Sequence, residues 1–171
     1  SGYPKGQMIP GIKVIEKIHP KTIRKSAKGY ILDMGQNMVG WVRIQVKGQA
    51  GDSVRLRFAE TLQENGELYT ANLRDAQATD LYILKGEGTE EWAPRFVYHG
   101  FRYVEVSEFP GTPTLTNFVG EVVNDDMPLT GTFECDNPVL NQLVKNAFWG
   151  IRGNYKGMPL DCPQRDERQP W

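Results

Sequence analysis

The sequence contains little cysteine and little histidine, and this scarcity excludes several kinds of site. Cys135 and Cys162 are the two cysteines among 171 residues, and no Cys-x-x-Cys pair occurs. A disulfide framework or a zinc site needs more such residues at closer spacing, so we expect two free thiols. The two histidines, His19 and His99, are far apart and lack the spacing of metal ligands. We therefore predict no metal site and no cofactor.

The sequence also lacks an excess of charge of either sign and any long apolar run. Lys and Arg number 20 and Asp and Glu number 21, which gives a net charge of -1. This balance provides no electrostatic reason to bind nucleic acid or an anionic membrane. No run approaches the roughly 18 apolar residues that span a bilayer, and the N-terminus lacks the pattern of an export signal. We therefore expect neither nucleic acid nor a membrane as a partner.

The first 125 residues contain short alternating runs that are typical of strands. Residues 40–47 and 53–59 alternate apolar and polar side chains, which indicates one buried face in each. A short glycine-containing link joins the two runs, so we predict an antiparallel hairpin. Further strands are expected at 12–18, 29–33, 78–85, 96–98, 102–106 and 117–123. About eight or nine short strands with frequent turns favour a mainly β fold, an antiparallel β-sandwich.

A helix is predicted after Asp126, where the alternation ends. Asn137 can cap a helix N-terminus, and Pro138 fits its first turn. The apolar residues that follow recur at helical spacing, namely Leu140, Leu143, Val144, Ala147, Phe148 and Ile151. One helix cannot bury such a stripe by itself. We therefore expect a sandwich domain over residues 1–125 and a second domain, of which 126–171 form a linker, a first helix and a loop of a truncated chain.

The segment 158–171 carries the densest group of charged side chains. Three carboxylates, two guanidinium groups and a tryptophan lie close together: Asp161, Arg165, Asp166, Glu167, Arg168 and Trp171. Pro163 and Pro170 prevent a long helix here. One interpretation is a sugar site, in which carboxylates bind hydroxyl groups, the ring stacks on a pyranose and one buried carboxyl acts as an acid. The alternative is a solvated loop held by ion pairs.

Two further segments also have two interpretations. Residues 33–41 form either a sugar-contacting loop or a turn that enters a strand with Trp41 in the core. We favour the turn, because a tryptophan in a strand usually packs. His99 lies in an aromatic-rich segment and could contact a ligand. We favour a turn histidine that bonds to the backbone, because buried polar groups are usually hydrogen-bonded.

Taken in order, these segments resemble the bacterial α-L-rhamnosidases, which are inverting glycoside hydrolases that release terminal α-L-rhamnose. The resemblance runs from about Tyr30 to Trp171. Its most specific string is DCPQRDER at 161–168, which follows the predicted helix. The earlier strings are DMGQNMVGW at 33–41, AETL at 59–62, NLR at 72–74, ATD at 78–80, YHGFRY at 98–103 and TGTFEC at 130–135.

The resemblance implies a β-sandwich domain followed by the start of a six-hairpin α/α barrel that holds the active site. The residue matching Glu167 is the general acid, and those matching Asp161 and Trp171 contact the rhamnose. We expect Arg165 to bind substrate beside them. The base lies further along the barrel, outside this chain, so the 171 residues alone are expected to be inactive.

The resemblance and the apolar stripe together indicate partners for this chain. The expected partners are a rhamnose-containing carbohydrate, the remainder of the catalytic barrel and, through the apolar stripe, a second copy in a homo-oligomer. The location is left open between the bacterial cytoplasm and the periplasm. A non-catalytic carbohydrate-binding or structural β-sandwich module would explain residues 1–125 equally well. It would not explain the helix or the carboxylates between Asp161 and Glu167.

Overall fold

The computed structural model describes residues 2–3, 5–6 and 8–165 of the chain. These residues form strands, two short 3-10 helices and one α-helix. The elements are β1 (Ile12–Ile18), β2 (Thr22–Ser26), β3 (Gly29–Lys47), β4 (Ser53–Ala59), β5 (Thr61–Leu62), β6 (Leu68–Tyr69), η1 (Ala71–Leu73), β7 (Thr79–Ile83), β8 (Thr89–Trp92), β9 (His99–Ser107), η2 (Leu115–Asn117), β10 (Phe118–Asp125) and α1 (Pro138–Asn154).

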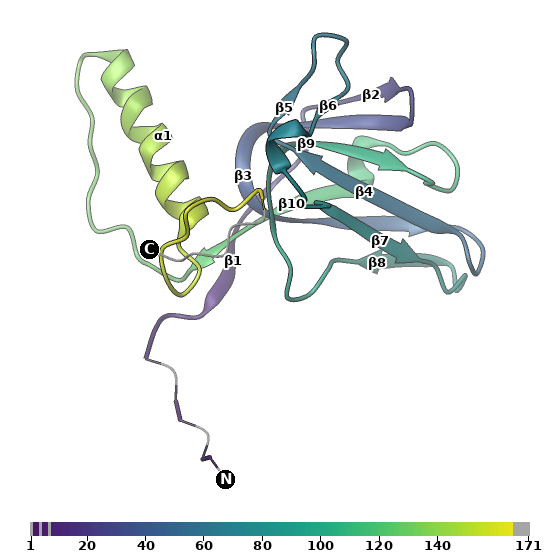
Figure 1. Ribbon diagram of the computed structural model, residues 1–171, viewed down its shortest axis with the longest axis horizontal. Helices are drawn as coiled ribbons and strands as arrows, with labels where there is room; N and C mark the ends of the chain where they lie inside the picture. Colours follow the sequence, from purple (N-terminus) through teal and green to yellow (C-terminus); the bar gives the residue numbers. More distant parts are fainter. Residues whose placement is uncertain (1, 4, 7, 166–171) are drawn as a thin grey trace.

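The larger sheet is antiparallel and curls over on itself (Figure 1). Its strands run in the order β1-β10-β3-β9-β4-β7, and β2 and β8 pair with the two ends of β3. The register between β3 and β9 shifts between Asp33 and Met38. Gly35 lies in this irregular stretch with a φ of +77°, a conformation that glycine adopts at little cost. The long strand β3 therefore carries the curl, and the prediction of a mainly β, antiparallel fold is confirmed.

The hydrophobic core lies between the facing parts of the curled sheet. The apolar residues of the two alternating runs are all buried: Val42, Ile44, Val46, Val54, Leu56 and Phe58. Phe101 of β9 and Phe118 of β10 pack into the same cluster. Each such side chain removed from water contributes about 1.5–3 kcal/mol to folding. The alternation thus identified correctly which face of each strand is buried.

The predicted hairpin between residues 40–47 and 53–59 is wrong. Residues 29–33 and 40–47 belong to one continuous strand, β3, and β4 pairs with β7 and β9. The link between β3 and β4 is bonded elsewhere, because the N–H of Gly51 donates to the carbonyl of Leu84 at 3.0 Å. Alternation reports which side of a strand is buried, but it does not report which strand lies beside it.

The strand predicted at 96–98 is also wrong. Phe96 has a φ of +61°, which is outside the extended region, and its side chain is fully exposed. Tyr98 is only partly buried. The aromatic residues of this segment therefore belong to a surface loop between β8 and β9 rather than to the core.

The predicted helix is confirmed as α1. The Asn137 side chain caps it by accepting from the N–H of Val139 at 2.9 Å. The helix lies beside the sheet and contacts β3 and β10 (Figure 1). Gly153 permits this approach, because a Cβ there would lie 2.9 Å from a methyl carbon of Val39.

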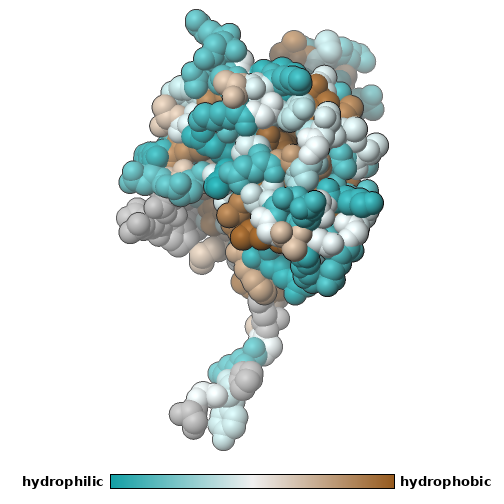
Figure 2. Space-filling model, turned by 90° about the vertical axis from the view of Figure 1, so that its right-hand side faces the viewer, coloured by the Kyte–Doolittle hydropathy of each residue, from teal (hydrophilic) through white to brown (hydrophobic). Residues whose placement is uncertain are grey.

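The sheet leaves most of the predicted apolar stripe of α1 exposed. Trp149 and Gly153 form the side that packs on the sheet. The stripe residues Leu140, Leu143 and Ile151 are 44%, 61% and 51% exposed. No helix among the described residues has the length and apolar character needed to cross a membrane. The face seen in Figure 2 is mostly hydrophilic, with hydrophobic residues in small separate patches.

Candidate functional site

A cleft of about 400 Å³ lies where β3, α1 and the loop after α1 meet. Residues 36–39 of β3 and Glu60 form one wall, and α1 contributes Trp149 and Gly153. Residues 161–164 of the loop close the cleft. The cleft therefore brings together residues 36–39 and 161–164, which belong to the two segments for which the sequence offered a sugar-binding interpretation.

Glycine at one position on β9 allows the loop to approach the sheet. A Cβ on Gly100 would lie 3.0 Å from the Cβ of Gln164 and 3.1 Å from Cγ of Pro163. The opposite wall is held by a hydrogen bond, since the Asn37 side-chain amide donates to Glu60 Oε1 at 2.9 Å. This hydrogen bond thus orients the polar side chains of that wall.

Asp161 lines this cleft, and Arg165 lies beside Asp161. Arg165 Nη2 is 3.7 Å from Asp161 Oδ2, and Arg165 Nε donates to the sulfur of Cys162 at 3.1 Å. The Asp161 side chain is 36% exposed, so solvent reaches the carboxylate. A carboxylate beside a guanidinium group can bind vicinal hydroxyl groups with charge-assisted hydrogen bonds. Glu167 and Trp171, the other predicted site residues, lie outside the described residues.

The end of α1 is tied to the sheet by two charged residues that the sequence analysis did not single out. The Asp125 carboxylate accepts from the N–H of Gly157 at 2.8 and 2.7 Å. Lys156 Nζ donates to the carbonyls of Arg152 and Gly153, each at 3.1 Å, and so caps the helix. A lysine just beyond the last helical turn is a known C-terminal signal. These contacts position the chain that leads into the 161–165 loop.

Burial lowers the pKa of Lys156 to about 8, although the Asp125 carboxylate acts in the opposite direction. Because the unfolded chain binds this proton more tightly, the free energy of unfolding should rise between about pH 8 and pH 10.5, by an amount on the order of 2–3 kcal/mol. Urea unfolding across this range, compared with Lys156→Met, isolates the effect. A difference between the two proteins that stays constant from pH 7 to 11 would contradict it.

Asp33, at the start of the irregular stretch of β3, has a structural role. Its carboxylate accepts from Arg102 Nε and Nη2, both at 2.8 Å, and from the N–H of Gly35 at 2.7 Å. The hydrogen bonds from Arg102 hold the pKa of Asp33 below its usual value, against the opposing effect of burial. The first residues of the 33–41 segment thus hold the bend, while 36–39 line the cleft.

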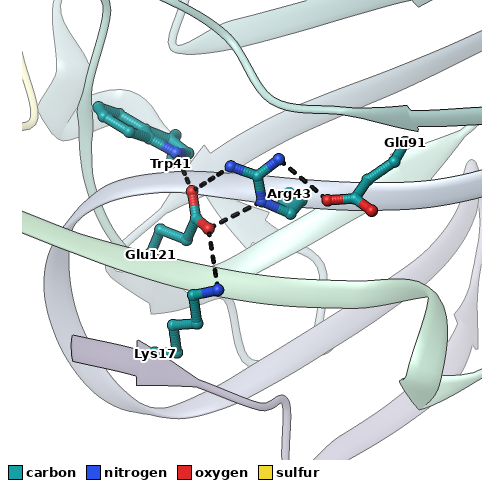
Figure 3. Close-up of polar contacts among 5 residues, drawn as sticks. All are labelled: Lys17, Trp41, Arg43, Glu91 and Glu121. Carbon is teal, nitrogen blue, oxygen red and sulfur yellow. Dashed lines mark hydrogen bonds and ion pairs between the residues drawn. The ribbon is translucent and has the colours of Figure 1, made fainter. Parts of the chain in front are cut away.

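The expectation that Trp41 lies in the core is wrong. Trp41 is partly buried, and its indole N–H donates to Glu121 Oε2 at 2.6 Å (Figure 3). Neighbouring residues along a strand point to opposite faces, so Trp41 takes the outer face when Val42 takes the core. The alternation of this strand contained that signal.

The expected backbone bond of His99 is replaced by a contact with a carboxylate. His99 is the first residue of β9 and is buried. Its Nε2 lies 2.9 Å from Asp80 Oδ1, and its ring stacks on Phe58 with a centroid distance of 4.2 Å. Asp80 is the last residue of the ATD string at 78–80. Nothing local in the sequence indicates that it lies beside His99.

The described residues contain no group of three or more His, Cys, Asp or Glu side chains placed to hold a metal ion. Neither Cys135 nor Cys162 forms a disulfide bond. The cleft therefore offers carboxylate and amide groups, with the Arg165 guanidinium beside the Asp161 carboxylate, and it has the chemistry of a site for a hydroxyl-rich molecule.

Two family models match consecutive parts of the chain. The bacterial alpha-L-rhamnosidase concanavalin-like domain matches residues 23–124, and the bacterial alpha-L-rhamnosidase six-hairpin glycosidase domain matches residues 128–171. Among curated proteins, the chain is 49% identical to an alpha-L-rhamnosidase of Streptomyces avermitilis over 161 residues, and 46% identical to one of Formosa agariphila over 156 residues. These matches cover 94% and 90% of this chain but 16% and 17% of the relatives. The chain thus spans about a sixth of their length.

Solved structures give the same similarity. The Streptomyces avermitilis alpha-L-rhamnosidase complexed with L-rhamnose matches with a TM-score of 0.91 and 48% identity, over 94% of this chain and 16% of that one. The alpha-L-rhamnosidase from Dictyoglumus thermophilum matches with a TM-score of 0.93 and 43% identity, over 96% of this chain and 19% of that one. Nearly the whole chain, which comprises the β domain and the helix beside it, therefore has the same fold as the matching parts of these two enzymes.

Proposed function

Because the chain belongs to the bacterial α-L-rhamnosidase family, we propose that it provides the β domain, the first helix and an active-site loop of an enzyme that hydrolyses terminal α-L-rhamnosides. The observation that carries the proposal is the cleft that Asp161, paired with Arg165, lines together with polar residues of β3. Its volume of about 400 Å³ lies within the roughly 300–1,000 Å³ typical of small-molecule sites. The relative bound to L-rhamnose supports a rhamnose-containing substrate.

The proposed roles follow the family resemblance. Asp161, Arg165 and Trp171 bind the rhamnose, and Glu167 is the general acid that protonates the leaving oxygen. The general base lies outside this chain, within the remainder of the barrel. The proposed division is a β domain over residues 1–125 and the start of the catalytic domain over 126–171.

Inversion follows from two carboxyl groups on opposite sides of the scissile bond. In such enzymes the acid and the base stand roughly 6.5–9.5 Å apart, which leaves room for the attacking water. Asp161 is a poor choice of base, because it stands only six positions before Glu167 in the sequence. We therefore propose that Asp161 acts on the sugar hydroxyls and that Glu167 needs a partner from further along the barrel.

The test uses an enzyme that comprises this chain and a complete six-hairpin domain, with p-nitrophenyl α-L-rhamnoside as substrate. NMR should show β-L-rhamnose as the first product, because one displacement inverts the anomeric carbon. Asp161→Asn should raise KM by about tenfold or more, because one bidentate hydroxyl contact is lost. Arg55→Met, remote from the cleft, is the control and should leave KM unchanged. Release of α-L-rhamnose first would overturn inversion, and no turnover of any rhamnoside would overturn the proposed function.

A further inference from the structure

A second, larger recess lies on the outer surface of β3 and beside the loop between β8 and β9. This surface groove has a volume of about 1220 Å³, and it shares no lining residue with the cleft at Asp161. Its lining combines aromatic residues with charged ones: Trp41, Phe96, Tyr98, Arg43, Glu91 and Arg95. The volume exceeds the roughly 300–1,000 Å³ of small-molecule sites. The groove therefore suits an extended ligand rather than a single small molecule.

One buried carboxylate orients the groove's tryptophan and one of its arginines. The Glu121 side chain is 2% exposed. It accepts from Trp41 Nε1 at 2.6 Å and from Arg43 Nε at 2.8 Å and Nη2 at 3.1 Å (Figure 3). Arg43 also donates to Glu91 at 3.1 Å, and Lys17 Nζ lies 3.8 Å from Glu121. The indole ring and the guanidinium plane are thus held side by side before any ligand arrives.

Stabilisation of the sheet alone does not explain why a buried carboxylate with charged partners stands here. A buried carboxylate with cationic partners is often no more stabilising than apolar residues of the same volume. What it does provide is a fixed orientation of groups that face the groove. Oriented groups lose less conformational entropy when a ligand binds, so they favour recognition.

Phe96 gives a second, independent indication that the groove is occupied during function. Its side chain is fully exposed and its backbone has a φ of +61°. Exposure leaves the ring without burial energy, and this conformation is strained for a bulky residue. Both costs are offset if the ring contacts a ligand in the groove that it lines.

The mixture of groups identifies the class of ligand. Nucleic acid needs a cationic surface, whereas this lining carries both signs and the chain has a net charge of -1. The cores of protein interfaces are depleted in glutamate and aspartate, whereas the Glu91 carboxylate lines this groove and pairs with Arg43. A pyranose combines an apolar face, which stacks on an aromatic ring, with hydroxyl groups that bind guanidinium and carboxylate groups. An oligosaccharide meets all of these requirements.

We propose that this groove binds a carbohydrate chain several sugar units long, at a site separate from the cleft around Asp161. Trp41 and Phe96 supply stacking surfaces, and Arg43 and Glu91 supply hydrogen bonds to hydroxyl groups. The presence of rhamnose in this carbohydrate rests on the proposed function. The groove would hold a polysaccharide on the enzyme while terminal residues enter the cleft.

Calorimetric titration of the 171-residue chain tests the proposal, with an α-L-rhamnose-containing hexasaccharide and free L-rhamnose as probes. The hexasaccharide should bind with a Kd at least tenfold below that of L-rhamnose, because it contacts more of the groove. Trp41→Ala and Phe96→Gly should each raise its Kd at least tenfold. Phe96→Gly is the cleaner variant, because the ring is fully exposed and glycine relieves the positive φ.

Two control variants separate this site from others. Phe133→Ala removes an exposed ring that does not line the groove, and Asp161→Asn alters the cleft, so neither should change the Kd. Absence of hexasaccharide binding, or binding unaffected by Trp41→Ala and Phe96→Gly, would overturn the proposal. Loss of binding in Asp161→Asn would assign the sugar to the cleft and would also overturn it. None of these outcomes depends on hydrolysis by the longer enzyme. The proposal of sugar binding in the groove can therefore be overturned while the proposed function stands, and the reverse.

Discussion

Glu167→Gln, made in the complete enzyme, is expected to lower turnover of an alkyl or disaccharide rhamnoside by about 10²–10⁴-fold. The amide keeps the shape of the side chain but cannot donate the proton that the leaving oxygen needs. Steady-state kinetics on such a substrate gives the size of the loss. KM should change little, because a general acid acts mainly on the transition state.

A rhamnoside with a good leaving group provides the internal comparison. Nitrophenolate leaves with little help from a proton, so Glu167→Gln should slow p-nitrophenyl rhamnoside hydrolysis much less than alkyl rhamnoside hydrolysis. Glu87→Gln is a matched control, because Glu87 is exposed in the loop between β7 and β8, and it should leave both rates unchanged. Equal losses on the two substrates would remove Glu167 from the role of general acid.

Arg43→Met is expected to destabilise the fold by about 3 kcal/mol, the largest effect that we expect from a single surface-facing residue. The change removes the main cationic partner of Glu121 and leaves a carboxylate that is 2% exposed. Burial raises the pKa of Glu121, but the hydrogen bonds from Arg43 and Trp41 outweigh it, so the pKa lies below the usual value of 4.5. Chemical denaturation at pH 7 measures the loss.

The chain contains a matched control for Arg43→Met. Arg55 Nε lies 2.8 Å from Glu108 Oε1, the same separation as Arg43 Nε from Glu121 Oε1, but both side chains of the control pair are 43% exposed. Water replaces a lost partner there, so Arg55→Met should cost under about 1 kcal/mol. Adding Glu121→Leu to Arg43→Met should recover most of the stability, because no buried charge remains. Equal losses for the two arginines would contradict the importance of burial.

The pH dependence of the same ion pair has a defined sign. A carboxyl group whose pKa is lowered on folding stabilises the protein above its unfolded pKa of about 4.5. That contribution disappears as the pH falls through the lower folded pKa. In Arg43→Met the opposing effect of burial is no longer balanced, so Glu121 should take up its proton at higher pH than in the native protein.

The sequence by itself determined the local features of this protein. Alternation identified the buried faces of residues 40–47 and 53–59, because burial of one face of a strand imposes a period of two on its composition. The cap and the first turn at Asn137 and Pro138 located the helix, because both act within one turn. The order of short strings, ending with DCPQRDER at 161–168, identified the family.

Only the tertiary structure decided how these pieces meet. Two predicted strands form one strand, β3, which is irregular around Gly35, and residues 40–47 pair with β8 and β10 rather than with the expected hairpin partner. Glu121 meets Arg43 from 78 positions away, so no local pattern could pair them. The cleft likewise joins residues 36–39 of β3 to residues 161–164, which are more than 100 positions away in the sequence. Periodicity records whether each residue is buried, whereas pairing depends on long-range packing energies that no short window of sequence contains.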